Sequence, residues 1–167
     1  MKRALTSELI DALARAPSIV IPLARQAPAE TRRRRPPSGK WSIHEHVVHL
    51  ADVDGLMTRR LDLILSEPDP LIRSYDPGRD EPGNRLLDLD FDDALERYAG
   101  YRGGLIERLR ALTAVEWRKP ARHEEYNSYS VFTMFRHVAL HDFQHAYRIE
   151  ELLLRQDWPA PFEPELE

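Results

Sequence analysis

Apolar residues recur every three or four positions in four separate segments of this chain, which is the spacing of amphipathic α-helices. In the first segment, Leu9, Leu13, Val20 and Leu23 fall on one face, and two prolines inside that segment predict a kink or a division. No stretch alternates convincingly between apolar and polar residues, as a half-buried strand would. The predicted helices cover residues 6–26, 42–66, 91–112 and 131–156.

Local signals mark where several of these helices begin. The sequence "SIHE" at Ser42 to Glu45 matches a capping box, in which the serine oxygen accepts a hydrogen bond from a free backbone amide and the glutamate reaches back. Asp90 has the position of an N-cap before the third helix. The sequence "TAVE" at Thr113 to Glu116 is a second capping box, which predicts one further turn that seats Trp117.

The connection between the second and third helices is long. Residues 67–88 contain four prolines and two glycines and show no clear period. Connections beyond about 12–15 residues are usually functional, disordered or cross between distant ends of a bundle. We therefore predict an all-α protein, a single domain over residues 1–167, folded as a four-helix bundle in which helices 2 and 3 are not a simple hairpin. An irregular tail is expected from about residue 157.

Composition and charge narrow the possible functions. The chain has 167 residues, enough for one domain with its own core, and its net charge of −4 argues against a nucleic-acid-binding protein. It has no cysteine, so a metal site would have to use nitrogen and oxygen ligands. No apolar run approaches the ~18 residues of a membrane span, and the first 17 residues lack the apolar block of a secretory signal. A cytoplasmic protein without membrane contact is expected.

The last predicted helix carries His137, His141 and His145 at intervals of four, which places them on one face. A buried ring without a partner costs about 1–3 kcal/mol, so each needs a hydrogen-bond partner, a water or a metal. A hydrogen-bonded core histidine and a metal ligand are both consistent with this pattern, and a metal site needs a third ligand from elsewhere. The apolar residues predicted on the same face are Met134, Val138, Ile149 and Leu152, whereas Asp142, Ala146 and Glu150 are predicted on the other side.

The second predicted helix offers further histidines. Its periodicity directs His46 and His49 inward and His44 outward. His44 and His123 are expected to face solvent or lie in a loop, without a functional role.

The segments "SGKWSIHEHVVHLADVD" and "SYSVFTMFRHVALHDFQHAYRIEEL" together resemble the DinB/YfiT family of four-helix-bundle metal-binding proteins. The similar features are the Gly-Lys-Trp-Ser before the second helix, a histidine followed by Leu-Ala-Asp, and a late HxxxH. The resemblance implies that one histidine of the second helix and the two of the HxxxH hold a divalent metal ion, zinc or nickel above all. In this chain those residues are His49, His141 and His145.

Other side chains are candidates for supporting roles. His137 could donate a hydrogen bond to a ligand or carry a proton, and Asp52 could support the site. Arg148 stands where family members often have glutamine, and it is predicted to face the cavity and either pair with Asp52 or Glu45 or await an anionic ligand. The alternative is a structural ion pair or a side chain that extends its charged end to solvent. The candidates for lining the pocket are Trp41, His46, Tyr126 and Tyr129. For the tryptophan and the two tyrosines, the alternative is hydrophobic packing at the end of the bundle.

Three neutral histidines leave positions on an ion open for water or substrate. The resemblance therefore implies a metal-dependent hydrolase or transferase that acts on a small molecule, with a low-molecular-weight thiol as a possible second reactant and a homodimer as a possible assembly. The alternative is a non-catalytic, stress-associated or binding bundle in which the histidine cluster is structural. Replacing the ligands would abolish activity in the first case and alter only stability in the second.

Overall fold

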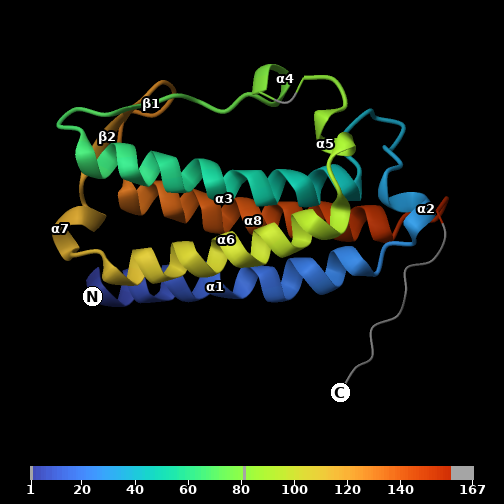
Figure 1. The fold of residues 1–167 in the computed structure, drawn as a ribbon, viewed down its shortest axis with the longest axis horizontal. Helices are drawn as coiled ribbons and strands as arrows, with labels where there is room; N and C mark the ends of the chain where they lie inside the picture. Colours follow the sequence, from blue (N-terminus) through green and yellow to red (C-terminus); the bar gives the residue numbers. More distant parts are fainter. Residues whose placement is uncertain (1, 81, 159–167) are drawn as a thin grey trace.

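Four long helices lie side by side along the length of the molecule (Figure 1). This computed structural model describes residues 2–80 and 82–158. The predicted division of the first helix is wrong, because α1 continues through both of its prolines. The last helix is shorter than predicted, and residues 159–167 of the expected tail lie outside the described part of the chain. The long helices are α1 (Lys2–Arg25), α3 (Ile43–Ser66), α6 (Phe91–Ala111) and α8 (Val131–Leu153).

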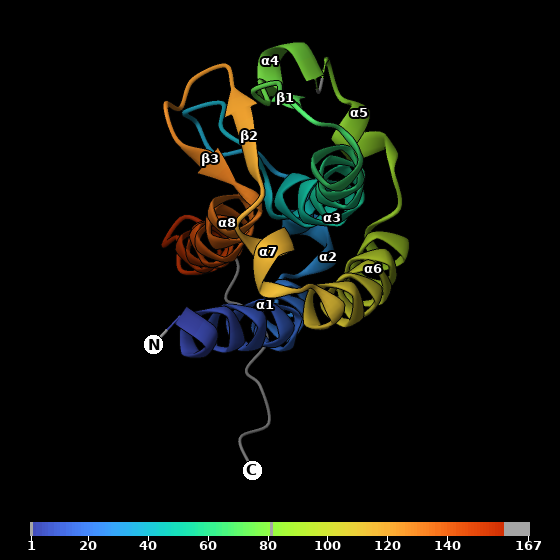
Figure 2. The same cartoon turned by 90° about the vertical axis from the view of Figure 1, so that its left-hand side faces the viewer.

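The order of the helices around the bundle differs from their order along the chain. Helix α3 packs against α6 and α8, and α1 packs against the same two helices, so α1 and α3 lie across the bundle from each other (Figure 2). Helices α3 and α6 run in the same direction, as do α1 and α8 (Figure 1). Because a hairpin cannot join parallel neighbours, the chain has to return along the outside of the bundle after α3. This arrangement accounts for the long crossover that the sequence predicted.

The crossover between α3 and α6 contains short elements of its own. They are β1 (Leu71–Ile72), α4 (Pro77–Asp80) and α5 (Arg85–Asp88). The crossover runs over α3 from one end of the bundle to the other (Figure 1). It therefore covers a side of α3 that would face solvent in a simple bundle.

The expectation of no strand was wrong, because the structure contains a small three-stranded sheet in the order β1-β2-β3. Strand β2 (Pro120–His123) pairs in parallel with β1 and antiparallel with β3 (Tyr129–Ser130). Strands of two to four residues are too short to show a period-two pattern, so the sequence could not reveal them. The sheet ties the start of the crossover to the segment that enters α8 (Figure 2).

The predicted capping boxes are confirmed at both positions. The Ser42 side chain accepts a hydrogen bond from the Glu45 amide, and the Glu45 carboxylate accepts from the Ser42 amide. Thr113 and Glu116 repeat this arrangement at α7 (Ala114–Trp117), which seats the buried Trp117. A further short helix, α2 (Ala29–Arg32), lies between α1 and α3. None of the helices in the described part of the chain combines the length and apolar character needed to cross a bilayer.

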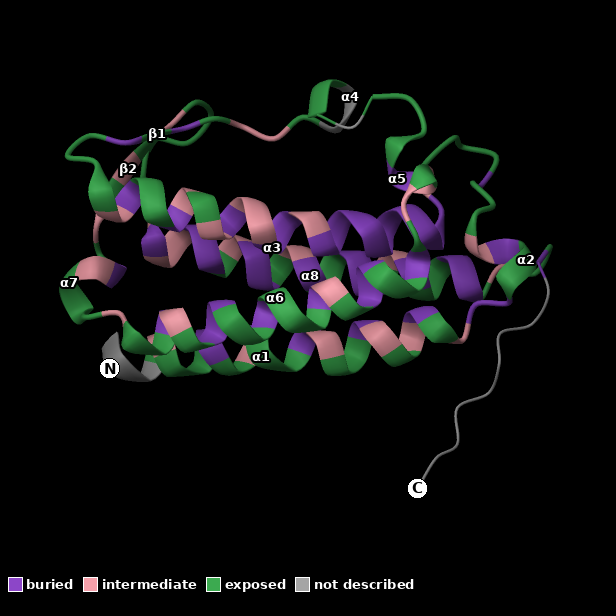
Figure 3. Cartoon of the chain, viewed as in Figure 1, coloured by how far each residue is buried: buried purple, intermediate pink, exposed green. Residues whose placement is uncertain are grey.

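The apolar core consists of two clusters with a buried polar layer between them. One cluster includes Leu61 and Phe135, and the other includes Leu95 and Ile149. Between them lies Arg102, which is only 2% exposed. Its guanidinium donates to Asp54 and Asp142, both fully buried, and to the backbone oxygen of Leu13. A single side chain of α6 thus joins all four long helices. The first half of α3 is buried on every side (Figure 3).

Candidate metal centre

The structure brings His49 of α3 together with His141 and His145 of α8. One ring nitrogen from each residue lies within 4.8 Å of the others. Nε2 of His141 is 3.1 Å from Nε2 of His49 and 3.0 Å from Nε2 of His145. The i, i+4 spacing stacks the two α8 rings on one face, and the packing of α3 on α8 supplies the third ring. This group of three imidazoles could hold a metal ion.

The outer nitrogen atoms of two of these rings have hydrogen-bond partners. Nδ1 of His145 lies 2.7 Å from Nδ1 of His46, and Nδ1 of His49 lies 3.2 Å from the hydroxyl of Tyr75. A histidine ligand usually holds its orientation through a hydrogen bond at the ring nitrogen that does not face the metal. If each Nδ1–H donates outward in these two pairs, the Nε2 lone pairs of His49 and His145 face the shared centre.

Burial keeps these rings neutral. It lowers the pKa of His46 and of His141 to about 4 each, and it lowers the pKa of His49 well below its ordinary value. The pKa of His145 is lowered too, first by burial and then by the neighbouring histidines. Neutral imidazoles carry the lone pair that a metal ligand requires.

Hydrogen bonds within the cluster do not explain both of the short contacts at Nε2 of His141. A neutral imidazole nitrogen has either one N–H or one lone pair, and each points in a single direction. Only one of the two contacts at Nε2 of His141 can therefore be a straight hydrogen bond. Two imidazole nitrogens at about 2.0–2.1 Å from one tetrahedral ion lie about 3.3 Å apart. The observed distances of 3.0 and 3.1 Å are close to that spacing.

Aromatic side chains enclose the cluster. The Trp41 ring, from the segment just before α3, lies 4.7 Å from the His49 ring and 6.0 Å from the His145 ring between centroids. On another side, His49 and His141 line a cavity of about 210 Å³. Tyr126, Tyr129 and His137 line the same cavity, and the ring of His137 lies edge-on to Tyr126 at 5.2 Å. The predicted pocket residues therefore lie around the histidine cluster, Trp41 and His46 against its rings and the two tyrosines along the cavity.

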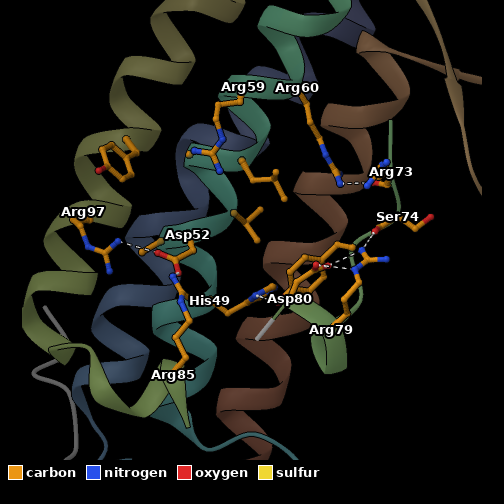
Figure 4. A pocket seen from close by; sticks show the side chains of 16 residues that line it. His49, Asp52, Arg59, Arg60, Arg73, Ser74, Arg79, Asp80, Arg85 and Arg97 are labelled. Carbon is orange, nitrogen blue, oxygen red and sulfur yellow. Dashed lines mark hydrogen bonds and ion pairs between the residues drawn. The ribbon is translucent and has the colours of Figure 1, made fainter. Parts of the chain in front are cut away.

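A larger cavity of about 690 Å³ adjoins the first, and His49 and Tyr75 line both (Figure 4). It lies between α3, the crossover and α6. Asp52 lines it and accepts hydrogen bonds from Arg85 and Arg97, each at 2.9 Å. No hydrogen bond joins Asp52 to the histidine cluster among the described residues, so Asp52 contacts arginines rather than these histidines.

Arg148 does not lie where the helical wheel placed it. The prediction that it faces the cavity was wrong, as was its pairing with Asp52 or Glu45. The structure agrees with the alternative of a structural ion pair on a side chain that extends to solvent, because Arg148 pairs with Glu151 one turn later and its side chain is 43% exposed. A long arginine at the edge of a buried stripe can extend to solvent and form an i, i+3 ion pair there. Glu45 instead pairs with Arg35, which comes from the segment before α3.

Three predicted orientations on α3 and α8 were also wrong. His44 is buried, and its Nε2 lies 2.8 Å from the backbone oxygen of Leu89, because the end of the crossover covers this side of α3. Asp142 and Ala146 are buried as well. Helix α8 packs against both α1 and α3, so its buried arc is wider than the single stripe inferred from the histidines.

The sequence contained no signal for two features of this site. Tyr75, which contacts His49, comes from a crossover without periodicity, 26 residues further along the chain. The arginines of the larger cavity come from α3, the crossover and α6. Only the return of the crossover over α3 brings these residues together.

Comparisons with known proteins identify the family and the fold of the chain. The sequence profile of the DinB superfamily matches residues 12–149. A protein of Oceanobacillus iheyensis that is named, provisionally, a metal-dependent hydrolase is 28% identical over 123 residues, which span 72% of this chain and 70% of that protein. YfiT from Bacillus subtilis, described as a probable metal-dependent hydrolase with an unusual four-helix bundle topology, superposes with a TM-score of 0.82 and 22% identity over 92% of this chain and 89% of YfiT. The likeness to YfiT confirms the predicted four-helix bundle.

Proposed function

The chain belongs to the DinB superfamily, and we propose that it is a metal-dependent hydrolase whose divalent cation is held by His49, His141 and His145. The observation that carries this proposal is the double contact at Nε2 of His141, with two further imidazole nitrogens at 3.0 and 3.1 Å. Three lone pairs directed at one ion account for these contacts, whereas one proton cannot serve both. The names of the two relatives support the same class of activity.

The residues present fit such an ion. Three neutral, buried nitrogen donors suit zinc and nickel, which are the ions we expect. When bound, an ion with three imidazole ligands supplies a Lewis acid that polarises a carbonyl or phosphoryl group and makes a water molecule more acidic. The other steps of hydrolysis depend on the side chains around the cluster.

Each of these side chains has a proposed task. Tyr75 and His46 hold the rings of their histidine partners in the orientation that a ligand needs. Trp41 covers one side of the cluster and keeps bulk water away from it. We assign proton transfer to His137, because it lines the cavity into which the His49 and His141 rings open.

Metal content tests this proposal directly. We expect about one equivalent of zinc or nickel in the purified wild-type protein by mass spectrometry and almost none in His141→Ala. The matched control is His123→Ala, which removes a histidine outside the cluster and should retain the metal. Hydrolysis of a panel of small esters and amides, with and without a chelator, then measures the activity.

The results separate the proposal from its alternative. A wild-type protein that is metal-free and still takes up no added zinc or nickel would overturn it. If the metal is bound but no substrate is hydrolysed, and the ligand variants change only the unfolding midpoint, the cluster supports the fold of a non-catalytic bundle.

Transfer of a low-molecular-weight thiol is a second candidate function. The observation that favours it is the pair of adjoining cavities, both lined by His49, which offer separate space for two reactants. In this reaction the thiol sulfur bonds to an electrophilic carbon, the leaving group departs with its electron pair, and the thiol proton passes to His137 or to solvent. Loss of free thiol in the presence of a small electrophile, abolished in His141→Ala, would support it.

A further inference from the structure

The larger cavity is strongly cationic. Among the described residues, six arginines and two aspartates line it, which gives a formal charge of 6 − 2 = +4 in a chain whose net charge is −4. A cleft lined by charges of one sign concentrates ligands of the opposite sign. The arginines are Arg59, Arg60, Arg73, Arg79, Arg85 and Arg97. We call this cavity the arginine pocket.

Protein carboxylates neutralise only part of this charge. Asp80 pairs with Arg79, and Asp52 is shared between Arg85 and Arg97 (Figure 4). Arg60 donates a hydrogen bond to the backbone oxygen of Arg73, at 2.6 Å. Within the described part of the chain, three of the six arginines form no ion pair with a carboxylate: Arg59, Arg60 and Arg73.

Arg59 and Arg73 differ from the other four arginines in their polar contacts. Within the described part of the chain, neither guanidinium group forms a hydrogen bond or an ion pair. An arginine fork matches the oxygen atoms of a carboxylate or a phosphate, and such charge-assisted bonds are among the strongest in proteins. Guanidinium groups without a protein partner that line one cavity are therefore suited to bind an anion.

Arg59 and His49 line the same pocket from different turns of α3. One terminal nitrogen of Arg59 lies 3.5 Å from the place where a side chain at Gly55 would begin. Gly55 follows His49 by six residues, which is about 9 Å along an α-helix. The guanidinium of Arg59 therefore folds back over the preceding turn of α3, toward the end of the helix that carries His49.

We infer that the arginine pocket binds a small organic anion, whose carboxylate or phosphate is held by the guanidinium groups of Arg59 and Arg73. This inference rests on the proposed function for one point, namely that the reacting end of the molecule lies at the histidine cluster. The pocket then sets the substrate class: a metabolite with its acid group several bonds away from the bond that reacts.

Direct binding tests the pocket without relying on activity. The full-length protein, treated with a chelator to remove metal, is titrated by calorimetry at low salt with inorganic phosphate and, separately, with succinate. We expect saturable binding of at least one of them, weakened about tenfold or more in Arg59→Met and in Arg73→Met. Binding of phosphate alone or of succinate alone identifies the acid group that the pocket accepts.

Two further variants sharpen this test. Arg15→Met removes one exposed arginine from α1, which does not line the pocket, and should bind like the wild type. Asp52→Asn removes the carboxylate that competes for Arg85 and Arg97, so it should bind the anion more tightly. If neither probe binds saturably, or if both pocket variants bind like the wild type, the inference is wrong.

The outcome is independent of the metal proposal. His141→Ala should lose metal and keep anion binding, because His141 does not line the arginine pocket. Anion binding by a protein that takes up no metal would support the inference about the arginine pocket and contradict the proposed hydrolase. Metal uptake without anion binding would support the metal site and contradict the inference about the arginine pocket.

Discussion

Replacing Arg102 with methionine should destabilise the protein severely. The guanidinium donates five hydrogen bonds of 2.6–3.2 Å to Asp54, Asp142 and the Leu13 carbonyl oxygen, all in the bundle interior. Removing one partner of a buried ion pair costs about 3–5 kcal/mol, and a buried carbonyl left without a donor adds about 1 kcal/mol or more. We therefore expect a loss of about 4–6 kcal/mol at pH 8, a large share of the 5–15 kcal/mol of an ordinary domain.

This loss should depend on pH. Burial raises the pKa of Asp54 and raises that of Asp142 to about 6, although Arg102 acts to lower both. With a carboxyl pKa near 4 in the unfolded chain, the folded state binds more protons, so stability falls as the pH rises from about 4 to 6. Without Arg102 the pKa values of Asp54 and Asp142 rise further, so the pH range over which stability falls extends to higher pH. The variant should therefore lose more stability at pH 8 than at pH 5.

Urea unfolding followed by far-ultraviolet circular dichroism measures these losses at the two pH values. The matched control is Arg108→Met, an arginine on the same helix whose pair with Asp62 is exposed, and its loss should stay below about 1 kcal/mol. If Arg102→Met does not fold, adding Asp54→Asn and Asp142→Asn removes both buried charges and should recover much of the stability. A loss below about 1 kcal/mol in Arg102→Met, or an equal loss at both pH values, would refute the reasoning.

The remaining predictions concern the ligand support and the start of α3. Tyr75→Phe removes the hydroxyl at 3.2 Å from Nδ1 of His49 and should weaken zinc affinity about tenfold or more, measured by competition with a chromophoric chelator; unchanged affinity would contradict this role. Ser42→Ala breaks a fully buried capping box and should cost about 1–2 kcal/mol in urea unfolding, more than Thr113→Ala at the exposed box, and equal losses would count against burial as the cause. Burial raises the pKa of Glu45, but the hydrogen bonds that its carboxylate accepts lower the pKa by more. Its stabilising effect should therefore be present above about pH 4 and disappear as the pH falls further. In Glu45→Gln this pH dependence should be absent.

The four helices could be predicted because their signals are local. Helical periodicity and the capping boxes at Ser42 and Thr113 depend on residues within a few positions of one another, and both boxes form as predicted. The same holds for the HxxxH of α8, whose spacing alone places His141 and His145 on one face. For the third member, the spacing of the second helix placed both His46 and His49 inward, and the family resemblance selected His49.

The remaining features depend on which segments meet in space. A helical wheel assumes one buried face, but the crossover covers a second side of α3, so His44 is buried against it. Tyr75 reaches His49, and the arginine pocket forms, because the same crossover returns over α3 from one end of the bundle to the other. Charge and hydrogen-bonding capacity can be read from the sequence, but whether Asp142 meets Arg102 across 40 residues of chain depends on the packing of the four helices. Local spacing therefore determined the helices and two of the clustered histidines, while the path of the crossover and the helix packing determined the partners around them.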